Sequence, residues 1–327
     1  MSDQWLSIRL DDLGAVRVQG ADAAGFLQGQ LSNDIGRLAS GHSQLSGYHT
    51  PQGRVIALLR LIWLGGDDIL AILPRELAPV VTARLSRFVL RAKVKIRDES
   101  EDWRIAGLVG VWTSNDPQLR GITQSSSLSL ATEPDGQTTF GSAIFVRVGS
   151  AAGSLEMGGA PRWLVISSAT ASADDSPGMP TVTVADRELW RRLDIESGQP
   201  QVFASTSEQF VAQMLNLDAL GAIAFDKGCY TGQEIIARAH YRGRVKRRLQ
   251  RFRTRAALHV AAGDTGHLAD GRPLQIVDAV RIENGRCEFL AVAPVASGDA
   301  EPEIHAAREA LASIDAESLA LPYTLPE

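Results

Sequence analysis

The chain has 327 residues, a formal net charge of −5, 44% hydrophobic residues and 22% charged residues. This balance is typical of a globular protein and excludes a disordered or fibrous chain, and the length predicts two or three domains. We expect no membrane association, because the most apolar stretch, residues 55–64, is too short to span a bilayer and contains Arg60. No basic segment followed by an apolar one opens the sequence, so we expect a cytoplasmic protein.

The first hundred residues alternate between strand and helix patterns. The segment 15–18 alternates as a strand does, and Gly20-Ala21-Asp22 then offers a cap for a helix that runs through Leu31. A turn at 47–53 precedes a strand over 54–63, and Gly65-Gly66-Asp67-Asp68 predicts a hairpin turn into a strand over 69–73. Residues 75–90 have helical spacing, and 93–96 resume a strand.

The second half begins loosely and ends in β patterns. Residues 113–180 are rich in Ser, Ala, Gly and Thr, so 125–129 and 167–179 are predicted as surface loops. A helix is predicted over 186–195. After Lys246, turns separate short alternating stretches at 274–277 and 288–292, which indicates a small β-barrel or sandwich with Cys287 in its core. The predicted class is α+β with a β-rich end.

Charge is concentrated in one stretch. Residues 235–262 contain no acid and carry these fixed cations: Arg238, Arg242, Arg244, Lys246, Arg247, Arg248, Arg251, Arg253 and Arg255. Such asymmetry favours an anionic ligand or partner. The alternative is a solvated strand or helix face whose charges pair with acids elsewhere, and the alternation of Arg251, Arg253 and Arg255 fits the outer face of a strand.

The strongest candidate for a chemically active site is the segment 225–234, Phe-Asp-Lys-Gly-Cys-Tyr-Thr-Gly-Gln-Glu. We predict a strand up to Phe225 and a helix over 233–240, which places Cys229 on the connection between them. A thiol near a helix N-terminus, beside Lys227 and near Arg238 in sequence, is in surroundings that lower a thiol pKa. The alternatives are a buried, inert Cys229 and a solvated Lys227. Two cysteines cannot form a four-thiolate metal site, so no metal ligands are predicted.

The segment Lys-Gly-Cys-Tyr-Thr-Gly-Gln-Glu, residues 227–234, resembles the signature of the YgfZ family, folate-binding relatives of the aminomethyltransferase (T-protein) of the glycine cleavage system. Other parts of the chain support the resemblance. They are Gly20-Ala21-Asp22 with Phe26 to Asp34, Arg91 to Val94, Ile195 to Pro200, Ala237-Arg238, Arg242-Gly243 and Leu321-Pro322-Tyr323. The resemblance therefore extends over essentially the full chain.

The resemblance implies a T-protein-like architecture. Residues 1–240 would form two interleaved α+β subdomains around a central channel, with internal boundaries near 50, 100 and 180, and residues 241–327 a small β-barrel. It also implies tetrahydrofolate, or a one-carbon derivative of it, as cofactor. The implied role is the assembly or repair of iron–sulfur enzymes, including those that modify tRNA, with Cys229 as the key thiol. The partners would then be folate, iron–sulfur client or assembly proteins and, through those clients, tRNA.

Individual positions carry further implications. Trp190 matches a family position that contacts folate, although its spacing with Leu189 and Leu193 equally fits a core tryptophan. Leu13 replaces an aromatic residue expected near the same ligand, and Arg238 would meet the anionic folate tail. The Asp pair of the true aminomethyltransferases is replaced by Ala57 and Leu58. Glycine-cleavage chemistry is therefore not expected, and whether the protein is an enzyme stays open.

Two other functions remain open on the sequence. One is a folate-dependent one-carbon transferase that acts on an unknown acceptor. The other is a tRNA-binding module that uses the basic stretch 238–255 and whose binding would depend steeply on salt. The sequence does not identify the client proteins, the folate form or the oligomeric state.

Overall fold

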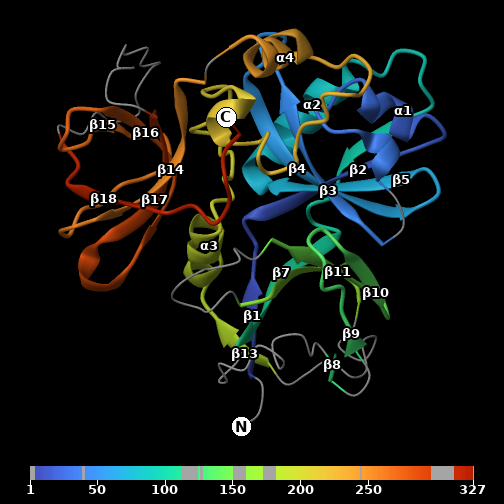
Figure 1. Ribbon diagram of the computed structural model, residues 1–327. Coiled ribbons are helices and arrows are strands. Elements are labelled where there is room, and N and C mark those ends of the chain that lie inside the picture. Colours follow the sequence, from blue (N-terminus) through green and yellow to red (C-terminus); the bar gives the residue numbers. More distant parts are fainter. Residues whose placement is uncertain are drawn as a thin grey trace. The chain divides into compact units, whose positions relative to one another are not determined.

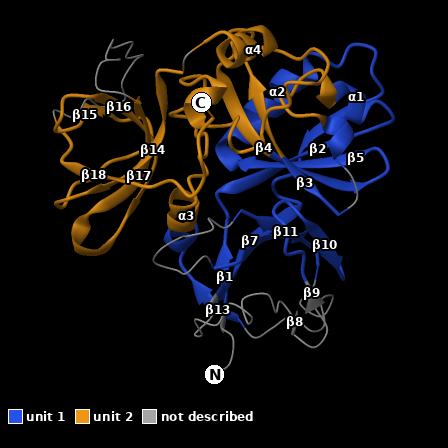
Figure 2. Cartoon of the chain, in the orientation of Figure 1, with its two compact units in different colours: residues 1–26, 35–44, 60–190 blue, residues 27–34, 45–59, 191–327 orange. Residues whose placement is uncertain are grey.

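The computed structural model describes residues 4–38, 41–111, 124–125, 128–149, 160–171, 182–243, 245–295 and 313–326 (Figure 1). The chain folds into two compact units (Figure 2). Unit 1 comprises residues 1–26, 35–44 and 60–190, and unit 2 comprises 27–34, 45–59 and 191–327. The chain thus passes repeatedly from one unit to the other. The domain boundary predicted near residue 240 stays a prediction.

Unit 1 contains a six-stranded sheet in the order β10-β11-β12-β7-β1-β13. Its strands are β1 (Gln4–Arg9), β7 (Trp103–Val111), β10 (Gln137–Phe140), β11 (Ala143–Val148), β12 (Arg162–Ser168) and β13 (Val182–Ala185). All pairs are antiparallel except β1 with β13. Strands β10 to β12 lie in the region predicted only as loops. Every residue of β11 is buried, so it lacks the alternation that marks a half-exposed strand.

A second sheet has the order β3-β4-β5-β2-β6. It consists of β2 (Leu13–Gln19), β3 (Ser43–His49), β4 (Val55–Gly65), β5 (Asp68–Pro74) and β6 (Lys95–Asp98). The predicted hairpin is confirmed: β4 and β5 are antiparallel, and Gly65 and Gly66 have positive φ in the turn. Two helices, α1 (Ala23–Gln28) and α2 (Ala78–Ser86), are shorter than their sequence patterns predicted.

The C-terminal part of unit 2 forms a five-stranded sheet in the order β15-β16-β17-β14-β18. The strands are β14 (Arg247–Thr254), β15 (Thr265–His267), β16 (Pro273–Arg281), β17 (Cys287–Pro294) and β18 (Ala316–Leu319). Among the described strands no ladder joins β15 to β18, but an isolated parallel bridge links Leu268 to Ile314. The expected barrel is therefore a sheet whose two ends meet at one bridge, without a continuous closed ladder.

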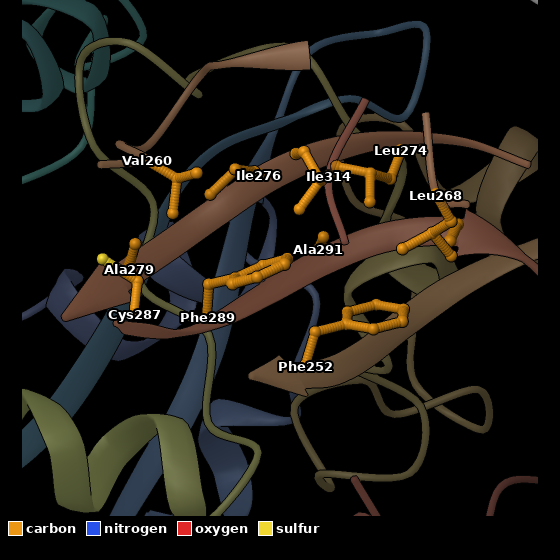
Figure 3. Packing of buried hydrophobic residues seen from close by; sticks show 11 residues of the cluster. Phe252, Val260, Leu268, Leu274, Ile276, Ala279, Cys287, Phe289, Ala291 and Ile314 are labelled. Atoms are coloured by element: carbon orange, nitrogen blue, oxygen red, sulfur yellow. The ribbon is translucent and has the colours of Figure 1, made fainter. Parts of the chain in front are cut away.

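A hydrophobic cluster fills one face of this C-terminal sheet (Figure 3). The rings of Phe252 and Phe289 stack with their centroids 5.4 Å apart. Cys287 is 1% exposed in this cluster, and its Sγ donates to the Leu258 carbonyl over 3.1 Å. The prediction of Cys287 as a core residue is confirmed.

The remaining elements are the two-stranded β8 (Gln124–Ser125) and β9 (Leu128–Ser129), α3 (Arg187–Glu196) and α4 (Gln233–Tyr241). Both α3 and α4 lie within one residue of the predicted bounds. Within the described ranges, no helix has the length and apolar character needed to cross a membrane.

Candidate functional site

The signature loop, residues 225–232, leads directly into α4, and both belong to unit 2. The strand predicted up to Phe225 is wrong. Ala222, Ile223 and Ala224 are buried, yet they form no ladder. Ser32 holds this segment instead, because its Oγ donates to the Ala222 carbonyl over 2.7 Å and its own carbonyl accepts from the Ala224 N–H over 3.0 Å. The apolar run thus reflects burial of a loop and not strand pairing.

Lys227 anchors the signature loop to residues 28–33. Its Nζ donates to three backbone carbonyls, those of Gln28 (2.7 Å), Leu31 (2.7 Å) and Asn33 (2.8 Å). An ammonium group has three N–H donors, so these bonds use all of them. Burial lowers the pKa of Lys227 to about 8, although the Asp34 charge opposes the shift. Lys227 is therefore not a solvated surface lysine, and its contacts indicate a positioning role.

Tyr230 packs beneath the loop against two charged or titratable groups. It is 8% exposed, and burial raises its pKa to about 12. The Nζ of Lys227 lies 5.0 Å from the centroid of its ring, and the His49 ring centroid lies 6.4 Å away. Tyr230, which follows Cys229 in the sequence, is therefore a buried side chain held by its packing.

His49, at the end of β3, is a residue that sequence reasoning treated only as part of a turn. It is 1% exposed, and neither ring nitrogen has a hydrogen-bond partner. Desolvation lowers its pKa to about 3, and the Gly47 backbone opposes this more weakly. A Cβ on Gly47 would lie 2.3 Å from the His49 ring, so only glycine leaves room for the imidazole.

A close contact between glycines holds the start of α4. Gly232 precedes α4 with a φ of 84°, and a Cβ there would lie 2.6 Å from the Thr50 carbonyl oxygen. Gly53, with a φ of 73°, closes the facing turn, where a Cβ would lie 3.0 Å from Ile235. Gln213 also donates from Nε2 to the Ile236 carbonyl over 2.7 Å. The signature loop is thus held at both ends.

Cys229 lies between these two anchors and is exposed. The structure therefore does not support the alternative of a buried thiol at this position, whereas Cys287 is buried. Arg238 is exposed on the following helix. Among the described residues, no group of three or more His, Cys, Asp or Glu side chains is arranged to hold a metal ion.

The other two residues predicted to bind folate belong to unit 1. Trp190 is 6% exposed, the Cζ of Arg162 lies 4.9 Å above its ring, and a Cβ on Gly107 would lie 2.2 Å from the ring. This packing favours the core alternative for Trp190. Leu13 begins β2 and pairs with Pro74, half-buried. Lys227 and Cys229 share one loop with Arg238 on the next helix, whereas Trp190 and Leu13 lie in the other unit.

Four of the eight described cations of the basic stretch pair with acids that are distant in sequence. Two oxygens of Asp218 accept from Arg248, over 2.9 and 3.0 Å. Glu288, which is 0% exposed, pairs with Arg251 over 2.8 Å and with Arg253 over 2.6 Å. The exposed Arg255 faces Asp315 at 3.4 Å. The pairing with distant acids is therefore confirmed for β14, but the solvated face is wrong, because Arg248 and Arg251 are 6% and 7% exposed. Arg244 lies outside the described residues.

Comparisons with known proteins extend to nearly the whole chain. No family model matches it. The tRNA-modifying protein YgfZ of Edwardsiella ictaluri is 33% identical over 254 residues, which cover 74% of this chain and 69% of that protein. The protein of the same name from Escherichia coli O157:H7 is 30% identical over 327 residues, covering 97% of this chain and 93% of that protein.

Among solved structures, the glycine cleavage system aminomethyltransferase T of Bartonella henselae has the same fold. It matches with a TM-score of 0.65 and 13% identity over 89% of this chain and 79% of that chain. At such low identity the match establishes the fold, and it confirms the T-protein-like α+β class. The identity to the Escherichia coli protein over 97% of this chain, with that to the Edwardsiella ictaluri protein over 74% of it, shows that the chain belongs to the YgfZ family.

Proposed function

We propose that the protein is a cytoplasmic, tetrahydrofolate-binding accessory factor for the assembly or repair of iron–sulfur enzymes, including enzymes that modify tRNA. Cys229 is its working thiol. The observation that carries the proposal is the exposure of this cysteine on a loop fixed by Lys227 and by the Gly232–Gly53 contact. Two relatives that are 33% and 30% identical to this chain are named tRNA-modifying proteins, which supports the link to tRNA.

The thiol acts with partners in this proposal. A single cysteine cannot hold an iron–sulfur cluster alone, because biological clusters are held by several ligands. Cys229 therefore contacts a cluster or a client protein transiently, and its exposure permits that approach. The loop anchors keep the thiol in one place, which lowers the entropic cost of forming such a contact.

Unit 2 contains buried hydrogen-bonding atoms without a partner that fit the pterin of a folate. A pterin carries several N–H donors, and the buried Gln30 Oε1 and both His49 nitrogens have no hydrogen-bond partner. Gln30 and the neutral His49 would accept hydrogen bonds from it, and the bound folate would supply one-carbon chemistry. Trp190 remains a proposed contact, but its ring is already covered by Arg162 and packed at Gly107.

The one-carbon transferase alternative is weakened by two apolar residues where an acid or base is expected. Ala57 and Leu58, at the positions of the aminomethyltransferase Asp pair, are 0% and 4% exposed in β4. Tetrahydrofolate binding without turnover of a methylene- or formyl-folate would favour the accessory role, whereas turnover by the purified protein would favour the transferase.

Folate binding is tested by anaerobic calorimetric titration of the purified protein with tetrahydrofolate. We expect saturable binding at one site, and Gln30→Ala should weaken it several-fold if that oxygen accepts from the pterin. Trp190→Phe keeps most of the buried volume, so a lower affinity would place the tryptophan at the ligand and an unchanged one would return it to the core. No binding by the unmodified protein would contradict the folate part of the proposal.

The cellular role is tested in an Escherichia coli strain that lacks its own YgfZ-family protein. Expression of this chain should restore a methylthio-modified tRNA nucleoside whose synthesis needs an iron–sulfur enzyme, as measured by mass spectrometry. A nucleoside made without iron–sulfur chemistry serves as the control. Absence of rescue at confirmed expression would contradict the accessory role.

A further inference from the structure

Three aromatic rings gather where α4 ends, next to the start of the signature loop. The rings of Phe225 and His240 are stacked with centroids 3.7 Å apart and an interplanar angle of 13°. Tyr241 meets both rings edge-on, with its centroid 4.7 Å from His240 and 6.1 Å from Phe225. We call Phe225, His240 and Tyr241 the α4 aromatic cluster.

Two members of this cluster, His240 and Tyr241, are exposed to solvent, and Phe225 is half-buried. Tyr241 is 67% exposed and Ile235, also on α4, is 40% exposed, while His240 is exposed as well. A large aromatic side chain exposed to this degree loses the stabilisation that burial would give it. Stacked rings with an open neighbour offer a flat surface on which an unpaired nucleobase can stack.

The charges around the cluster are complementary to phosphate. Arg238, Arg242 and Lys246 are exposed, and no acid occurs between Ile235 and Ala262. By contrast, Arg248, Arg251 and Arg253 on β14 and Arg255 just after it pair with Asp218, Glu288 and Asp315. These four arginines already have acidic partners, whereas the exposed cations named above lie at and after the end of α4. Two exposed acids, Asp226 and Glu234, lie on the loop and in the first turn of α4.

We propose that the α4 aromatic cluster, with Arg238, Arg242 and Lys246, binds single-stranded RNA. Unpaired bases stack on Tyr241 and His240, and the three cations neutralise backbone phosphates. The choice of RNA over DNA rests on the proposed function, whereas the surface itself needs neither folate nor Cys229. The interface differs from the whole basic stretch 238–255, because the ion-paired arginines of β14 take no part in it.

The test is fluorescence anisotropy with a labelled single-stranded uridine decamer, titrated with the full chain at several salt concentrations. With three phosphates neutralised, log K should fall against log salt with a slope of about −2. Tyr241→Ala should weaken binding about 5- to 100-fold while Tyr241→Phe retains it, because the ring is what stacks. Arg242→Ala should make the slope shallower by about 0.7.

Arg281→Ala is the matched control, since Arg281 is an exposed arginine at the end of β16 in the same unit. It should leave both the affinity and the salt slope unchanged. The proposal is overturned if the decamer does not bind, if Tyr241→Ala and Arg242→Ala bind as well as the unmodified chain, or if the decamer binds equally when annealed to its complement.

The outcome is separable from the proposed function. Retained rescue of tRNA modification without RNA binding would overturn this interface alone. RNA binding by a protein that neither binds folate nor rescues the deletion strain would overturn the accessory role alone.

Discussion

Lys227 shows at the residue scale how the signature loop is fixed. A charged group that donates three hydrogen bonds to backbone carbonyls contributes more than a neutral one, since charge-assisted bonds are stronger. Lys227→Met removes all three and leaves the carbonyls of Gln28, Leu31 and Asn33 without this donor. We predict a loss of about 2–4 kcal/mol in the free energy of unfolding, measured by urea denaturation.

Lys246→Met is the control for this change, because Lys246 is an exposed lysine. It should alter the free energy of unfolding by less than about 0.5 kcal/mol. Equal effects of the two substitutions would contradict the anchoring role of Lys227.

His49 predicts a pH dependence. Its pKa falls from 6.5 to about 3 on folding, so below pH 6.5 the unfolded chain binds the extra proton. The stability that His49 contributes is therefore present above pH 6.5 and is lost as pH falls toward 3, with a slope of up to about 1.4 kcal/mol per pH unit.

The measurement compares the unmodified chain with His49→Leu by urea denaturation at each pH from 7 down to about 4. The comparison is needed because burial raises the pKa of Asp278 to about 6, which gives an opposite slope over part of the same range. The variant should lose less stability on acidification than the unmodified chain. Parallel curves would show that the imidazole is protonated in the folded state.

The sequence predicts Cys229 and Lys227 as site residues because the signature is one uninterrupted segment. It did not identify what they contact. The carbonyls bound by Lys227 lie almost two hundred residues earlier in the chain. Every residue has a backbone carbonyl, so the identity of the residue does not reveal such a contact. His49 was missed for a related reason, since its burial depends on Gly47 and Tyr230 coming together in the fold.

At the scale of elements, the two glycines of the signature loop have different roles. Gly232 has a positive φ and sits against the Thr50 carbonyl, whereas a Cβ on Gly228 would meet no atom within 4 Å. Gly232→Ala should therefore cost about 2 kcal/mol or more in the free energy of unfolding.

Gly228→Ala is its matched control in the same loop and should be neutral or stabilising by up to about 1 kcal/mol. Thermal or urea unfolding of both variants decides between them. A neutral Gly232→Ala would show that the turn at residues 50–53 does not constrain the start of α4.

Strand β14 carries a buried ion-pair network. Burial alone raises the pKa of Glu288, but hydrogen bonds from Arg251 and Arg253 outweigh it and hold the pKa below its ordinary value. Glu288→Gln should destabilise the protein by about 3–5 kcal/mol, because two arginines lose their buried counter-charge.

Asp315→Asn disrupts the exposed pair with Arg255 and should cost less than about 1 kcal/mol. Urea denaturation of both variants measures the contrast. A Glu288→Gln cost as small as that of Asp315→Asn would mean that the pairs on β14 do not stabilise the fold.

Elements with clear periodicity were predictable, and those without it were not. α3 and α4 follow their apolar spacing closely, and the β4–β5 hairpin follows its glycines. β11 was missed because it is buried on both faces, and the segment before Phe225 was mistaken for a strand because it is buried without pairing. A local apolar pattern indicates that a segment is buried, whereas strand pairing depends on residues that are distant in the sequence.

For the whole molecule, the fold is shared with an aminomethyltransferase at 13% identity, while Ala57 and Leu58, where we expect that chemistry's Asp pair to be replaced, are buried in β4. The fold therefore carries little information about the reaction, whereas the residues of the site carry most of it. The site that we propose is an exposed cysteine on a fixed loop, which favours action on partner proteins over turnover of a small substrate.

The most direct test of this account is rescue of iron–sulfur-dependent tRNA modification in the deletion strain by Cys229→Ser at equal protein level. The account predicts loss of rescue with unchanged folding, because an exposed thiol contributes little to stability. Cys287→Ala, which removes the chain's other thiol from the core, should still rescue. Full rescue by Cys229→Ser would contradict the central claim that this thiol does the protein's work.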